Sequence, residues 1–232
     1  MSMLSVVTIG QAPRVDVTPE LAEILGDGVR IVEHGALDPL GPDEIAALAP
    51  PPGAAGVLTS RLRSGGHAVF THTAIEPLLA RAIARGETDG ADATLVICSS
   101  HFPEFPHGRP VFYLEPLAHA AVRGLLSGFD APRLGLVNPL ADQVEEGASR
   151  WRNSVGATIG GATAASPYAD SVEDIAASAA SIAPASDLIV LDCIGYGRDA
   201  EQAARAACAE AGHAVPVLTV RSLGARLLAA ML

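Results

Sequence analysis

Short apolar runs alternate with segments of helical spacing along most of the chain. The apolar runs predict strands at 6–9, 29–32, 93–98, 111–114, 133–137, 157–159, 188–191 and 215–220. Helices are expected near 19–25, 43–48, 75–85, 117–126, around Trp151, and at 171–182, 199–211 and 222–232. Residues 58–62 and 68–70 read as a hairpin, because Ser64-Gly-Gly separates them. This alternation predicts a mostly parallel sheet with right-handed crossovers.

The pattern restarts at Glu115-Pro116, and each of the two series contains one strand that ends in a cysteine. The fold class expected is therefore α/β, with two similar parallel-sheet lobes that face each other across an interlobe cleft. The similarity between the two halves is one of architecture, since no residue-level repeat is visible.

The two strand-end cysteines are the strongest candidates for chemistry. Cys98 follows the apolar run that begins at Ala93, and Cys193 follows Leu188–Leu191 and Asp192. Open α/β folds bind ligands at the carboxyl ends of their strands. Two thiols on different lobes could approach opposite faces of one carbon, so that a thiolate removes an α-proton and a thiol returns one. Nearby helix N-termini favour the thiolate, and strand alternation turns the Asp192 side chain away from Cys193.

Other roles for the cysteines remain open. Both could be ordinary buried cysteines, a common fate for this residue. A disulfide is disfavoured in a reducing compartment. A zinc site built on Cys98, His101 and His107 lacks a second close ligand pair, so no metal is expected. His101 could instead tune the Cys98 thiol or lie on a surface loop. Cys208 lies in an Ala-rich helix and is expected in the core.

Strand-end loops supply further candidate ligands for a small molecule. After the first strand, Arg14 could clamp a carboxylate with two hydrogen bonds and Gln11 could orient it. The alternative for Arg14 is an exposed side chain paired with Asp16. Asn138-Pro and Ser166-Pro-Tyr168 are also strand-end loops with hydrogen-bonding side chains.

Composition excludes several kinds of function. Hydrophobic residues make up 49% of the chain, the net charge is -11, and all 15 basic residues are arginines. Without lysine there is no Schiff base, no pyridoxal anchor and no P-loop lysine. Gly195-Tyr-Gly also lacks the third glycine of a dinucleotide fingerprint, so no nicotinamide site is expected. An acidic chain without basic clusters is not expected to bind nucleic acid or a membrane. No signal peptide or membrane span is evident, so a cytoplasmic location is expected.

Several motifs in order resemble one known family. Residues 8–14 (TIGQAPR), 35–38 (GALD), 166–168 (SPY) and 191–196 (LDCIGY) are similar to the AroM family, which is related to the aspartate/glutamate racemase superfamily. The resemblance spans essentially the whole chain. It implies cofactor-independent chemistry at an interlobe site, and a homodimer. It also implies a swapped C-terminal segment, which places residues 1–115 plus 216–232 in the first lobe and 116–215 in the second.

The resemblance also assigns roles to residues. Cys98 matches the first-lobe cysteine and Cys193 the second-lobe one. Ser99 and Ser100 stand where the amino-acid racemases have Asn-Thr, which hold the substrate carboxylate. Ile194 and Gly195 stand where those enzymes have Thr-His, so specificity for aspartate or glutamate is not implied. The Tyr196 hydroxyl could compensate for the loss.

These observations together predict a cofactor-independent racemase or isomerase of a small carboxylate or amino acid, with Cys98 and Cys193 as its acid/base pair. Two alternatives stay open. One is an isomerase or decarboxylase that uses a single cysteine. The other is a non-catalytic carboxylate-binding or sensor protein on the same fold, since fold does not settle function.

Overall fold

The chain forms two compact units, each built on a parallel sheet. The computed structural model describes residues 2–232. The first unit extends to Leu114 and includes Leu232, and the second comprises Glu115–Met231. None of the helices within residues 2–232 is long and apolar enough to cross a membrane.

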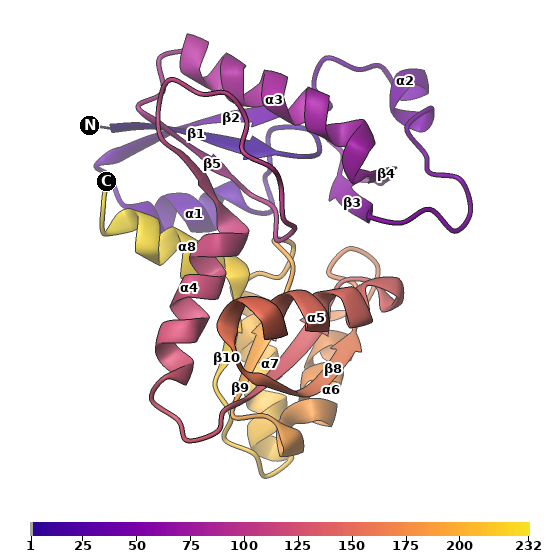
Figure 1. Cartoon of the computed structure of the whole chain (residues 1–232), viewed down its shortest axis with the longest axis vertical. Coiled ribbons are helices and arrows are strands. Elements are labelled where there is room, and N and C mark those ends of the chain that lie inside the picture. Colours follow the sequence, from indigo (N-terminus) through magenta and orange to yellow (C-terminus); the bar gives the residue numbers. More distant parts are fainter. Residues whose placement is uncertain (1) are drawn as a thin grey trace. The chain divides into compact units, whose positions relative to one another are not determined.

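The first unit contains a four-stranded sheet in the order β2-β1-β5-β6, and all its pairs are parallel (Figure 1). Its strands are β1 (Ser2–Thr8), β2 (Val29–Gly35), β5 (Ala93–Val96) and β6 (Val111–Tyr113). The helices are α1 (Thr18–Leu25), α2 (Pro42–Ala46) and α3 (His72–Thr88). The antiparallel hairpin expected from Ser64-Gly-Gly is present as β3 (Val57–Arg61) and β4 (His67–Thr71).

The second unit contains another four-stranded parallel sheet, in the order β10-β9-β7-β8. Its strands are β7 (Arg133–Asn138), β8 (Thr158–Ala164), β9 (Leu188–Leu191) and β10 (Val217–Thr219). Its helices are α4 (Leu114–Leu126), α5 (Val144–Val155), α6 (Val172–Ile182), α7 (Arg198–Glu210) and α8 (Val220–Ala229), with short 3-10 turns at Ala141–Gln143 and Ala183–Ala185. The α/β architecture with two similar lobes is therefore confirmed.

The two sheets share one strand order. If the strands of each sheet are numbered along the chain, both sheets read second-first-third-fourth. The order reverses between the first and third strands, which are β1 and β5 in one unit and β7 and β9 in the other. In open α/β sheets this reversal leaves a crevice at the carboxyl ends, where ligands bind. Each unit thus has one predicted ligand position, and it lies where a cysteine-terminated strand ends.

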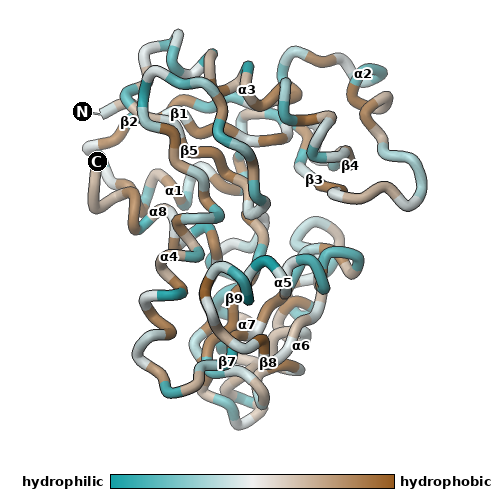
Figure 2. Tube along the Cα trace, viewed as in Figure 1, coloured by the Kyte–Doolittle hydropathy of each residue, from teal (hydrophilic) through white to brown (hydrophobic). Residues whose placement is uncertain are grey.

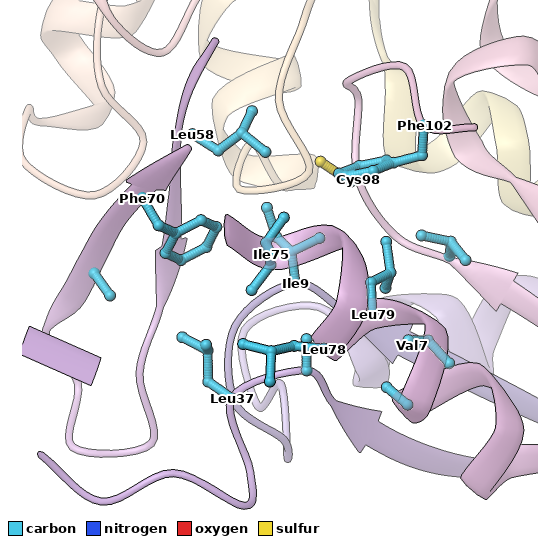
Figure 3. Packing of buried hydrophobic residues seen from close by; sticks show 14 of the residues in the cluster. Val7, Ile9, Leu37, Leu58, Phe70, Ile75, Leu78, Leu79, Cys98 and Phe102 are labelled. Carbon is cyan, nitrogen blue, oxygen red and sulfur yellow. The ribbon is translucent and has the colours of Figure 1, made fainter. Parts of the chain in front are cut away.

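The core of the first unit lies between its sheet, α3 and the β3–β4 hairpin. Figure 3 shows this cluster, with Val7 and Ile9 from the β1 end, Leu79 from α3 and Phe70 from β4. Hydrophobic stretches mark β1 and β5 in the trace, whereas α5 carries a hydrophilic stretch (Figure 2). The buried side of α5 is formed by Gly147, Ala148, Trp151 and Val155.

Strand β8 is longer than the 157–159 run predicted for it. Gly160 and Gly161 interrupt the apolar pattern, and glycine is disfavoured in strand interiors. The packing requires glycine here, because a Cβ on Gly160 would lie 1.8 Å from the Ala185 carbonyl oxygen. The two glycines that allow β8 to pack therefore also prevent its full length from being predicted from the pattern of apolar residues.

The assignment of residues 216–232 to the first lobe stays a prediction. Within that segment, β10 is hydrogen-bonded to β9, and so it forms an edge strand of the second sheet.

Candidate functional site

Cys98 lies just beyond the carboxyl end of β5. The ladder continues past the strand, because Ile97 donates its backbone N–H to the Val7 carbonyl. The thiol is 8% exposed and belongs to the apolar cluster of the first unit, with Phe102 among its members (Figure 3). The Phe102 ring lies 5.0 Å from the His72 ring. Cys98 therefore combines the predicted strand-end position with largely apolar surroundings.

The serines that follow Cys98 are half-buried in a bend, whereas His101 and His107 are exposed. His107 Nδ1 lies 2.7 Å from the Phe105 carbonyl oxygen of its own loop. Across residues 2–232, no group of three or more His, Cys, Asp or Glu side chains could hold a metal ion. Ser99 and Ser100 are thus the hydroxyl groups nearest in sequence to the first candidate thiol.

Gln11 connects the loop after β1 to its surroundings in the first unit. Its Oε1 accepts the Arg63 N–H at 3.1 Å, and its Nε2 donates to the Leu37 carbonyl at 3.5 Å. Arg63 in turn pairs with Asp38 at 3.0 Å. The amide of Gln11 therefore links the β3–β4 hairpin to the loop after β2.

Arg14 pairs with Asp16, as the alternative interpretation of the sequence predicted, but its side chain is buried and not exposed. Its Nε and Nη2 donate to the two Asp16 oxygens at 2.9 and 2.8 Å, and its Nη1 donates to Thr8 Oγ1 at 3.1 Å. The guanidinium is only 1% exposed. Burial by itself raises the pKa of the Asp16 carboxyl, but the hydrogen bonds and charge of Arg14 outweigh it and hold that pKa below its usual value. The Arg14 guanidinium, which could bind the carboxylate of a ligand, therefore binds the carboxylate of Asp16 in this structure.

Cys193 has polar groups close to its sulfur. The Tyr168 hydroxyl lies 3.8 Å from its Sγ, and the Gly195 N–H donates to Sγ at 3.4 Å. The thiol is 7% exposed. Residue 195 must be glycine for this arrangement, since a Cβ there would lie 2.7 Å from Pro167 and 2.8 Å from Tyr168. A backbone N–H and a phenol hydroxyl thus both lie close to this sulfur.

The loop after Cys193 is held from two sides. Tyr196 is fully buried and donates its hydroxyl to the Ala165 carbonyl. Burial, and to a lesser extent the neighbouring Cys193 and Asp192, raise the pKa of Tyr196 far above its ordinary value, so its phenol stays neutral. Arg221 of α8 is also buried and donates to the Ile194 carbonyl through Nε at 2.9 Å and through Nη2. In this structure the Tyr196 hydroxyl therefore anchors the loop.

The remaining candidates of the second unit lie in the loops beside Cys193. Asn138, at the end of β7, is 1% exposed and donates through Nδ2 to the Thr163 carbonyl at 3.3 Å. Ser166 Oγ accepts the Tyr168 N–H at 3.2 Å, and the Ser166 N–H donates to Asp170 at 2.6 Å. Ser166 thus fixes the turn that carries Tyr168 towards Cys193.

An ion cluster that joins the half-buried Arg150 to two buried carboxylates, one of them next in sequence to Cys193, could not be predicted from the sequence. Asp192 Oδ2 accepts from Arg150 Nη2 and from Trp151 Nε1, each at 2.8 Å. Arg150 Nε lies 2.9 Å from Glu115 Oε1, an ion pair whose geometry is not that of an aligned hydrogen bond. The Trp151 ring meets His119 edge-on at 4.1 Å. The members of this cluster are far apart in the sequence, so no local spacing predicts it. The one indication in the sequence is Asp192, an acidic residue at the end of a buried strand.

Asp192 and Cys193 lie beyond the end of β9 at Leu191, so strand alternation does not apply to them, but they contact different neighbours. The carboxylate is bound by α5, whereas the sulfur faces the Tyr168 loop. The third cysteine, Cys208, is fully buried on α7, and burial raises the pKa of its thiol.

The first unit also contains a Ser-His-Asp chain that sequence analysis did not single out. Ser5 Oγ lies 2.9 Å from His34 Nδ1, and His34 Nε2 lies 2.9 Å from Asp89 Oδ2. Ser5 is fully buried under α3, where a Cβ on Gly86 would lie 2.2 Å from Ser5 Oγ. A serine covered in this way cannot reach a substrate, so the chain joins β1, β2 and the end of α3.

Several solved structures share this fold. A Nocardia farcinica maleate cis-trans isomerase bound to TRIS aligns with a TM-score of 0.62 and 17% identity, covering 100% of this chain and 93% of that one. The aspartate racemase of Picrophilus torridus aligns with a TM-score of 0.55 and 15% identity, covering 99% and 95%. The glutamate racemase of Aquifex pyrophilus aligns with a TM-score of 0.56 and 13% identity, covering 99% and 84%.

At these identities the shared feature is the fold of racemase- and isomerase-like proteins. A comparison with curated protein sequences gives no match. The family model described as AroM protein matches residues 4–232, which is nearly the whole chain. The strand-end motifs that suggested this family lie within the matched range. The chain therefore belongs to the AroM family.

Proposed function

We propose that the protein is a cofactor-independent racemase or isomerase of a small carboxylate, with Cys98 and Cys193 as its acid/base pair. The observation that carries the proposal is positional. Each cysteine follows the third strand of its own parallel sheet, beside the point where strand order reverses. If both cysteines served only to fill the core, packing would not require them to occupy equivalent positions in the two units.

The proposed reaction is a proton exchange at the carbon beside the carboxylate. One thiolate accepts the α-proton, and the electron pair of the broken C–H bond passes into the carboxylate as an enolate. The second thiol then donates its proton to the opposite face, so each turnover exchanges the roles of the two sulfurs. Ser99 and Ser100 are the proposed donors to the carboxylate, where they would stabilise the developing charge.

The test is solvent-deuterium incorporation. The protein is incubated in D2O with a panel of amino and dicarboxylic acids, and proton NMR follows loss of the α-proton signal. Cys98→Ser and Cys193→Ser should each lower the exchange rate by at least about 10²-fold, the usual scale for a lost acid or base. Cys208→Ser, at a buried cysteine of α7, is the matched control. Unchanged rates in both strand-end variants would reject the assignment.

A second candidate is isomerisation or decarboxylation by Cys193 alone. It is favoured by the groups at the Cys193 sulfur, since the Tyr168 hydroxyl and the Gly195 N–H both lie close to it. Mass detection of a covalent adduct on Cys193 only would support it over two-base exchange. Ligand-induced stabilisation without deuterium incorporation, adduct or turnover would indicate a binding protein instead.

A further inference from the structure

The residue before the second cysteine poses an electrostatic problem. Asp192 is 2% exposed and directly precedes Cys193. A buried carboxylate so close to a thiol opposes its deprotonation, because water and salt screen the repulsion poorly in the interior. A Cys193 thiolate therefore requires the charge of Asp192 to be balanced within the protein.

The structure supplies that balance from one helix. Arg150 and Trp151 are successive residues of α5, and both donate to the same oxygen of Asp192 at 2.8 Å. Arg150 also pairs with Glu115 at 2.9 Å, which fixes the guanidinium between two buried carboxylates. Trp151 is fully buried, so the indole is a rigid donor. The carboxylate is thus held by two donors of α5.

Other charged and titratable side chains also lie near Cys193. They include Tyr168, Asp170, Tyr196 and Arg221, besides Asp192 and the Arg150 that is bound to it. Arg221 donates to the Ile194 carbonyl, and Asp170 accepts the Ser166 N–H. Glu115 of α4 pairs with Arg150, and His119 of α4 contacts the Trp151 ring.

We propose, resting on the acid/base role proposed for Cys193, that Arg150 is a positioning residue that neutralises and orients Asp192 so that Cys193 can exist as a thiolate. Arg150 touches neither the sulfur nor a substrate in this scheme. It acts through Asp192, and Trp151 supports it through the second hydrogen bond. The role is specific to the second unit, where an acidic residue immediately precedes the cysteine.

The experiment measures the thiolate directly and needs neither turnover nor reagent access. The full chain is labelled with cysteine carrying ¹³C at Cβ, and the Cβ shifts are followed against pH. Signals are assigned with Cys98→Ser, Cys193→Ser and Cys208→Ser. Arg150→Met should raise the pH midpoint of Cys193 by about one unit, a tenfold loss of thiolate at fixed pH, and leave Cys98 unchanged. Trp151→Phe should shift it in the same direction by less.

Two controls separate charge from structure. Arg152→Met removes an exposed arginine from the same helix and should leave the Cys193 midpoint in place. Arg150→Met combined with Asp192→Asn should restore the midpoint, because the carboxylate that needed balancing is gone. If Arg150→Met does not fold, the pH midpoint of Cys193 is compared instead between Trp151→Phe and the double variant Trp151→Phe with Asp192→Asn.

The outcomes are distinct from those of the activity assay. A Cys193 midpoint that moves no more in folded Arg150→Met than in Arg152→Met overturns the role of Arg150, as does a wild-type Cys193 that never titrates. A shifted midpoint in a protein that exchanges no deuterium would leave Arg150 in its role and reject the proposed function.

Discussion

At the scale of single residues, position at the end of a strand separates the candidate thiols from a Ser-His-Asp chain with a structural role. The Ser5–His34–Asp89 chain has the residue types of a catalytic triad, yet its serine is fully buried under Gly86 of α3. Cys193 is also largely buried, but a tyrosine hydroxyl and a backbone N–H approach its sulfur. What distinguishes the two sites is the strand end, where the chain leaves the sheet and ligands can bind.

The contact between α3 and Ser5 predicts opposite effects for two helix glycines. Gly86→Ala should destabilise the protein by about 1 to 2 kcal/mol, because overpacking against the Ser5 side chain outweighs the gain in helix propensity. Gly124 of α4 is exposed and has open space around it, so Gly124→Ala should stabilise by about 0.5 to 1 kcal/mol. Urea unfolding of both variants checks the pair. A stabilised Gly86→Ala would show that the helix can move away from β1.

At the scale of elements, local sequence signals set several helix starts. Helix α6 begins at a capping box in which Ser171 Oγ accepts the Asp174 N–H at 3.1 Å and Asp174 accepts the Ser171 N–H at 3.2 Å. The side-chain hydrogen bond from Ser171, followed by the backbone one, holds the pKa of the Asp174 carboxyl below its usual value. This cap is purely local, so its energetics can be tested without disturbing either candidate thiol.

The cap gives a prediction with a defined pH dependence. Ser171→Ala should cost about 1 kcal/mol at neutral pH. Because the Asp174 pKa is lowered in the folded state, its contribution is present above the unfolded pKa and is lost as the pH falls through the folded one. The stability gap between wild type and Ser171→Ala should therefore narrow in acid. Ser181→Ala, in the last turn of the same helix, is the control and should change little at any pH. If the difference in unfolding free energy between wild type and Ser171→Ala stayed constant down to strongly acidic pH, the proposed contribution of the Asp174 carboxylate to the cap would be contradicted.

Elements with clear periodicity could be predicted from the sequence, and contacts between distant residues could not. The runs before Cys98 and Cys193, and the hairpin at Ser64-Gly-Gly, follow from local pattern and turn chemistry. The Arg14–Asp16 pair was foreseen as an alternative, but its burial was not. Arg150 and Asp192 are joined only through the packing of α5 on the second sheet, and no pattern within either segment indicates the contact.

At the scale of the whole molecule, the two units repeat one strand order without repeating its residues. Cys98 belongs to the first unit and Cys193 to the second. The Cys98 residue belongs to the apolar cluster of its unit, and the Cys193 sulfur lies next to the Tyr168 phenol. The proposed function imposes a geometric condition, because both sulfurs must flank one carbon.

That condition can be tested in solution with a short bifunctional reagent. Reacting atoms in a productive complex lie about 3 to 3.5 Å apart, so the two sulfurs are expected within roughly 7 Å of each other. Dibromobimane, whose fluorescence develops fully only after both arms have alkylated thiols, should therefore link Cys98 to Cys193. The chain has no lysine, so trypsin cleaves after arginine only, and the linked product should join peptides 86–123 and 153–198.

The matched controls are Cys98→Ser and Cys193→Ser, which should each abolish the fluorescent product, and Cys208→Ser, which should leave it unchanged. Dilution distinguishes a link within one chain from a link between copies, because only the latter falls with protein concentration. Single-arm labelling of both thiols without any 86–123 to 153–198 link would mean that the sulfurs do not share a substrate. Two-base exchange would then be excluded, and single-cysteine chemistry at Cys193 would become the function to pursue.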